Sequence, residues 1–164
     1  MAAMTAVDET MNAINDAVVL GRQGNTAAAR ERLTELWETI GADGDPLHRV
    51  SLAHYMADLQ DHAADGLTWD IRALDACAAL TDERAQAQHS GLSVRGFYPS
   101  LHLNLADNYG RLGAFDTARR HLNASRDRLA DLSDDGYGLG VRAGIANVEA
   151  ALADHSTERL PSHP

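Results

Sequence analysis

One segment of the chain occurs twice. Residues 21–33 read GRQGNTAAARERL and residues 110–122 read GRLGAFDTARRHL, and six positions coincide without a gap. In each copy, two glycines follow a stretch with helical spacing of apolar residues, and alanine, arginine and leucine come next. A helix–turn–helix unit that is repeated in this way cannot bury its apolar face alone, so it packs against its neighbours. The duplication therefore predicts a stack of helical hairpins.

Composition and periodicity also favour an all-α fold. Hydrophobic residues make up 45% of the chain and aromatic residues only 5%. Alanine is frequent; it has the best helix propensity, and its small side chain lets helices approach closely. No segment shows the alternation of a strand, whereas apolar residues recur at helical spacing in seven segments. We expect helices at about 5–22, 26–40, 46–60, 63–80, 99–112, 115–132 and 139–154.

The second copy of the duplicated segment lies within a longer pattern, in residues 99–132. This stretch resembles a tetratricopeptide repeat, a helix pair of about 34 residues with the pattern W-x₂-L-G-x₂-Y, A-x₃-F and P. It departs from that pattern at His102, at Ser125 and in having no closing proline. Residues 9–42 match less well and residues 47–80 least. The matching positions are Leu105, Ala106, Tyr109, Gly113, Ala118 and Leu122.

The resemblance extends over most of the chain, which is similar to uncharacterised actinobacterial tetratricopeptide-like proteins. It implies a right-handed stack of about three antiparallel helical hairpins, with the last helix as a cap. The two clear copies begin 89 residues apart, whereas two repeats would span about 68. We therefore expect an insertion at residues 81–96, between the second and third repeats. Residues 1–155 would form one domain, and residues 156–164 a frayed tail.

The resemblance also implies a binding groove. In tetratricopeptide proteins the first helix of each hairpin lines a concave face, where an asparagine before the conserved leucine commonly binds the backbone of a ligand. Asn15 and Asn104 hold this position here. The family's lysine-rich clamp is missing, because the chain has no lysine. The resemblance implies an adaptor that binds a protein or peptide segment through Asn15, Arg22, His54, Tyr55, Asp58, Asn104, Asp107 and Arg111.

Three other hypotheses stay open at this stage. The polar groove residues can be simply solvated, and an uncovered hairpin face can pair with itself in a structural homo-oligomer, such as a homodimer. A metal-dependent enzyme is the third, because His54, Asp58 and His62 follow one another at i, i+4 and i+8, which is one face of a helix. We expect the helix to end near Asp61, which would turn His62 away. The sequence therefore predicts no enzyme, no metal and no cofactor.

Charge and hydropathy exclude further classes of partner. The formal net charge is −10, and such a surface repels phosphate backbones, so we expect no nucleic-acid partner. No run approaches the roughly 18 apolar residues of a membrane span, and the first residues lack the apolar stretch of a signal peptide. We expect a cytoplasmic protein without a membrane partner. The single cysteine, Cys77, excludes an internal disulfide, and its apolar surroundings predict a buried side chain.

Overall fold

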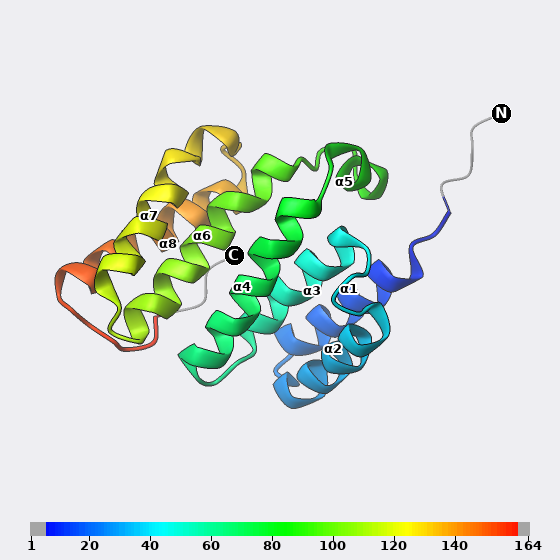
Figure 1. The fold of residues 1–164 in the computed structure, drawn as a ribbon, viewed down its shortest axis with the longest axis horizontal. Helices are drawn as coiled ribbons and strands as arrows, with labels where there is room; N and C mark the ends of the chain where they lie inside the picture. Colours follow the sequence, from blue (N-terminus) through cyan, green and yellow to red (C-terminus); the bar gives the residue numbers. More distant parts are fainter. Residues whose placement is uncertain (1–5, 161–164) are drawn as a thin grey trace.

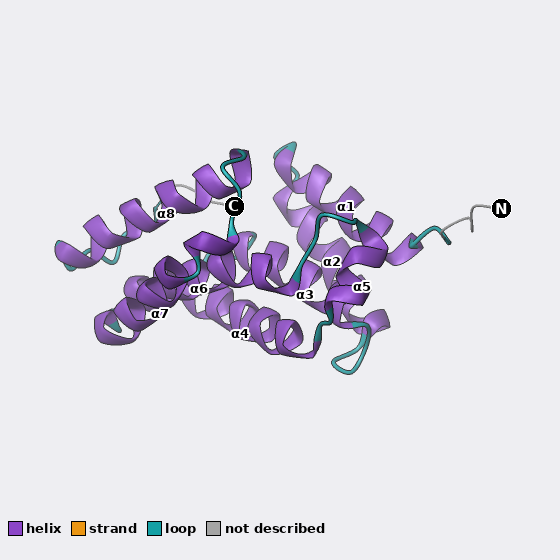
Figure 2. Cartoon of the chain, turned by 90° about the horizontal axis from the view of Figure 1, so that it is seen from above, coloured by secondary structure: helices purple, strands orange, loops and turns teal. Residues whose placement is uncertain are grey.

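The computed structural model describes residues 6–160, and every regular element among them is a helix (Figures 1 and 2). This confirms the all-α class. The predicted start of the first helix, at residue 5, lies outside the described residues. The elements are α1 (Glu9–Arg22), α2 (Thr26–Ile40), α3 (Pro46–Asp58), α4 (Ala63–Ala79), α5 (Asp82–Gln88), α6 (Val94–Arg111), α7 (Phe115–Asp127), the 3₁₀ helix η1 (Leu129–Asp131) and α8 (Gly136–Ala153).

The long helices pack in consecutive pairs. Helix α1 lies against α2, α3 against α4, and α6 against α7, while α4 also packs on α6 and α8 covers α6 and α7 (Figure 1). Seen from above, α1 and α8 lie on one side of the molecule, and α4 and α7 lie on the other (Figure 2). Helices α3 and α6 therefore lie between these outer helices, where a binding surface can form along them.

The duplicated segment forms the same turn twice. Gly24 and Gly113 adopt φ values of 92° and 79°, which glycine reaches without the steric cost of a Cβ. In both turns the backbone N–H that follows this glycine donates to the carbonyl five residues earlier, at 3.1 Å and 2.9 Å. This is the hydrogen bond of a Schellman helix end. The sequence repeat is thus a repeated way of ending one helix and starting the next.

The first glycine of each copy lets another helix come close. A Cβ on Gly21 would lie 3.3 Å from Leu59, at the end of α3. A Cβ on Gly110 would lie 3.0 Å from Leu152, near the end of α8. Helix α8 therefore contacts the α6–α7 pair at Gly110, which is the same position of the repeat at which α3 contacts the α1–α2 pair.

Three predicted helix boundaries are wrong. The first helix begins at Glu9 rather than near residue 5, and residues 6–8 are not helical. The helix expected to open at Pro99 begins at Val94, because the Ser93 side chain accepts a hydrogen bond from the N–H of Gly96 and caps an earlier start. Pro99 is buried inside α6. The segment expected as one helix to residue 132 ends at Asp127 and continues as the 3₁₀ turn η1.

Residues 81–96 contain α5, which closes the N-terminal ends of α1 and α3. Arg84 donates to the Asp45 carboxylate at 2.7 Å and to the Asp8 carboxylate at 2.8 Å, and His48 lies 2.9 Å from Asp8. Both aspartates cap helices. Burial raises the pKa of Asp8, but the hydrogen bonds from Met11 N–H, His48 and Arg84 outweigh it and lower that pKa to about 2. A charged cluster thus joins three elements that are distant in sequence.

The apolar interior has two parts that meet at α6. One is built from α1 to the start of α6, and the other from α6, α7 and α8. Cys77 is fully buried in the first part, as predicted. Large buried members of the first part are Ile14, Leu33, Leu47, Val50, Leu52 and Leu101; those of the second are Leu103, Leu122, Val141, Ile145 and Val148.

Candidate functional site

An open cavity of about 670 Å³ lies between the middle of α3 and the N-terminal half of α6. The end of α1, the α5–α6 loop and the segment before α8 complete its walls. Its floor and rim combine apolar groups with hydrogen-bonding groups. The apolar and aromatic lining includes Val50, Leu92, Phe97, Leu101 and Leu132, and the polar lining includes Arg22, His54, Tyr55, His89, Ser100 and Tyr137.

Three of the predicted groove residues, Arg22, His54 and Tyr55, line this open cavity. They come from different hairpins, because Arg22 ends α1 while His54 and Tyr55 lie on α3. Asn104 on α6 adjoins them, with its Nδ2 atom 3.4 Å from His54 Nδ1. Tyr137 closes the far wall by donating to Ser100 Oγ at 2.6 Å. The structure therefore gathers these polar groups around one space.

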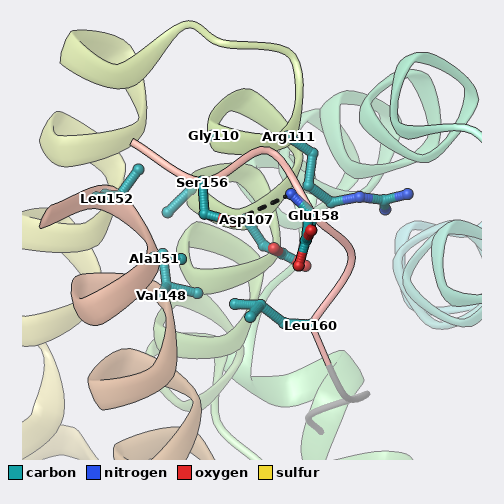
Figure 3. Close-up of a pocket in the computed structure, with 10 residues that line it drawn as sticks. Asp107, Gly110, Arg111, Val148, Ala151, Leu152, Ser156, Glu158 and Leu160 are labelled. Carbon is teal, nitrogen blue, oxygen red and sulfur yellow. Dashed lines mark hydrogen bonds between the residues drawn. The ribbon is translucent and has the colours of Figure 1, made fainter. Parts of the chain in front are cut away.

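The C-terminal ends of α3 and α6 carry the next group of predicted residues, and the chain's own tail covers them. Figure 3 shows residues 156–160 running past Asp107 and Arg111 of α6, beside the end of α8. The cavity that they leave is only about 10 Å³, close to the space of one water molecule. Arg159 Nη2 lies 3.5 Å from the carbonyl oxygen of Asp58 at the end of α3. The tail thus fills this end of the groove.

Leu160 is the apolar anchor of this segment, because it is partly buried against the second part of the core. We expected residues 156–164 to be frayed. Residues 156–160 make the contacts described above, and residues 161–164 lie outside the described residues.

A buried polar network lies behind the groove. Asn108 donates to the Asp70 carboxylate at 2.6 Å, and Arg111 donates to the Asn108 side-chain oxygen at 3.2 Å. Asp70 is only 1% exposed and Asn104 only 3%. The Oδ1 atoms of these two residues have no hydrogen-bond partner in the structure. A buried polar atom without a partner is costly, so these two oxygens set the network apart from the apolar packing around it.

Asp70 and Asn108 were not predicted from the sequence. The position of Asp70 in the sequence could have identified it. It stands three residues before Ala73 and seven before Cys77, which are both buried, so it lies on the apolar face of α4. A carboxylate in an apolar stripe needs a partner or a proton. The partner, Asn108, is 38 residues away, so only the fold could identify it.

The environment of the carboxyl groups shifts their proton affinities. Asp58 is exposed at the end of α3, yet desolvation by the protein around it and the nearby Asp107 raise its pKa to about 7, against the opposing effect of Arg159. Burial raises the pKa of Asp70 well above its usual value, and Asp58 and Asp107 add to the effect. These carboxyl groups therefore favour a proton or a nearby cation.

Asn15 and His62, which were also named from the sequence, both lie outside the two cavities. Asn15 is exposed on α1 and lines neither of the two cavities. Helix α3 ends at Asp58, and His62 is exposed at the start of α4. Within residues 6–160, no group of three or more His, Cys, Asp or Glu side chains is placed to hold a metal ion. In the same range no helix is long and apolar enough to cross a lipid bilayer.

Comparison of the chain with protein-family models, with curated proteins and with solved structures finds no match.

Proposed function

We propose that this chain is a tetratricopeptide-like adaptor that binds a peptide or protein segment in the groove between α3 and α6. The observation that carries this proposal is the open cavity of about 670 Å³. Ligand sites typically measure about 300–1,000 Å³ and combine an apolar lining with a few placed polar groups. This cavity has both properties, and three residues named for binding from the sequence line it.

The arrangement of the helices supports the tetratricopeptide-like part of the proposal. The same turn ends α1 and α6. The equivalent glycines Gly21 and Gly110 lie in close contact with the ends of α3 and α8. We infer a right-handed stack of hairpins, in which α8 takes the place of the first helix of a fourth hairpin. In such a stack the first helices line one continuous surface.

The lining suits an extended peptide. Tyr55, Phe97 and Tyr137 offer large flat contacts, which bury much area at little cost in side-chain entropy. Arg22 and His54 offer hydrogen bonds to backbone carbonyl groups or to acidic side chains. Because Asn104 and the Tyr137–Ser100 pair already bond within the protein, part of the site is preorganised, and this lowers the entropic cost of binding.

The test is selection of peptides from a displayed random library on the full-length chain, followed by calorimetric titration of the selected sequences. We expect His54→Ala and Arg22→Ala to weaken binding by at least about tenfold, which corresponds to about 1.4 kcal/mol. The matched controls are His62→Ala and Arg32→Ala, which change exposed residues outside the cavity. Failure to select any peptide, or equal affinities in all four variants, would overturn the proposal.

A further inference from the structure

The closed end of the groove gathers acidic side chains from three helices. Asp58 ends α3, Asp107 lies on α6, and Asp70 lies behind them on α4. The three carboxyl groups are close enough to influence one another electrostatically. The cation that opposes this accumulation at Asp58 is Arg159, from the tail. The chain therefore places a guanidinium group of its own at this acidic end.

A second observation points to a ligand at the same place. Asp70 is almost fully buried, and its Oδ1 atom has no hydrogen-bond partner. Its other oxygen is bound to Asn108. A buried carboxyl group that is only half satisfied stabilises positive charge brought near it. Asp70 therefore favours positive charge at this end of the groove through its electrostatic influence on Asp58 and Asp107.

Among the described residues 156–160, the tail is held at this site by few contacts. Arg159 donates one long hydrogen bond, of 3.5 Å, to the Asp58 carbonyl, and residues 157–159 are exposed. Leu160 supplies the apolar contact, against the second part of the core. A terminal segment with so few contacts exchanges readily between bound and released states. The tail shows that a basic and an apolar side chain fit the site. Another segment can displace the tail.

We propose that the closed end of the groove binds a basic residue followed by a leucine-like residue of the peptide partner, and that Arg159 and Leu160 hold this place in the free protein. The proposal rests on the peptide-binding function above and names the chemistry of the ligand. The occupant is therefore a cationic peptide segment that displaces the tail.

Charge complementarity favours this partner over an acidic one. The whole chain carries a formal net charge of −10, so its field attracts basic segments and repels acidic ones. The tail competes as an intramolecular ligand at a high effective concentration. A partner must match its basic and apolar contacts to replace it, and this requirement gives the site selectivity.

The test uses a synthetic acetylated peptide with the sequence of residues 154–164, titrated into isotope-labelled full-length protein and followed by nuclear magnetic resonance. We expect the Arg159→Ala protein to bind this peptide at least about fivefold more tightly than the wild-type protein, because the internal competitor is weakened. A peptide with alanine in place of its arginine should bind at least about tenfold more weakly. That change lies in the ligand, so it cannot affect the folding of the protein.

Protein variants locate the contact. Asp58→Asn and Asp107→Asn, each made in the Arg159→Ala background, should weaken binding of the arginine-containing peptide by at least about threefold. Asp116→Asn is the matched control, since Asp116 is exposed on α7. The inference is overturned if the peptide does not bind the Arg159→Ala protein, or if its affinity is indifferent to the arginine or to both aspartates.

The library selection separates this failure from failure of the proposed function. One outcome is that the binding of the selected peptides depends on His54 but on neither aspartate, and that these peptides share no basic residue. This outcome would overturn the cationic-ligand inference and leave the peptide-binding function standing. If no peptide binds the full-length chain, both fail together.

Discussion

Single glycines hold the two duplicated turns in a conformation that other residues adopt at a cost. Gly113 has a φ of 79°, and a Cβ built on it would meet no atom within 4 Å. The requirement at this position is therefore conformational and not one of space. Gly110, three residues earlier, has the opposite requirement, because a Cβ there would come within 3.0 Å of Leu152. The same residue type serves two different physical purposes in one motif.

Substitution of the turn glycine tests this reading. Gly113→Ala should lower the free energy of unfolding by about 1 kcal/mol, because alanine is strained in the left-handed region. Gly136→Ala, at the start of α8, is the control; that glycine has an ordinary φ and open space around it. Urea unfolding measures both variants; it is followed by the fluorescence of Trp37 and Trp69, whose ring centroids lie 5.2 Å apart. An equal effect of the two substitutions would contradict the assignment.

At the scale of the element, helices whose limits depend on local signals were predicted well. Helix α2 runs from Thr26 to Ile40 as expected, and Asp45 caps α3 with Pro46 in its first position. Caps, glycines and proline at a first position act within a few residues, so the sequence displays them directly. The start of α6 was missed because Pro99 resembles such a first position but lies in the helix interior.

A tertiary contact joins the stretch of α6 around the interior proline to α7. Ser125 on α7 donates from its hydroxyl to the carbonyl oxygen of Pro99 at 2.7 Å, and both side chains are buried. Proline cannot donate a helical hydrogen bond, and this bond ties the weakened stretch of α6 to its neighbour. Ser125 also explains a departure from the repeat pattern, because an alanine at this position could not donate.

Removal of the hydroxyl measures this contact. Ser125→Ala should cost about 1 kcal/mol of unfolding free energy, the usual net value of one intramolecular hydrogen bond. Ser90→Ala, in the exposed loop before α6, should change stability by less than about 0.5 kcal/mol and serves as the control. A Ser125→Ala protein as stable as the wild type would show that this bond contributes nothing to stability.

At the scale of the whole molecule, the acidic end of the groove links proton binding to folding. The pKa of Asp58 is about 7 in the folded protein and 3.8 without this environment. Between about pH 4 and pH 7 the folded state thus binds more protons than the unfolded state. Its stability therefore falls as pH rises through this window, and stays at the lower level above it.

Asp58→Asn tests that linkage, because asparagine resembles the protonated carboxyl group at every pH. We expect the variant to be more stable than the wild type at pH 8, and the difference to disappear near pH 4. Thermal unfolding followed by circular dichroism at the two pH values measures this. A stability difference of the same size at both pH values would contradict the raised pKa.

The sequence by itself determined the helical class, most helix limits and the repeated turn, because propensity, periodicity and capping act over one or two helical turns. Of the eight residues that it named for binding, three line the open cavity and two line the small cavity beside the tail, and their role stays a prediction. Only the tertiary structure decided how they meet: His54 and Asn104 are 50 residues apart, and the packing of α3, α4 and α6 joins them. The tail position and the buried Asp70 depend on the same long-range packing, which no local signal encodes.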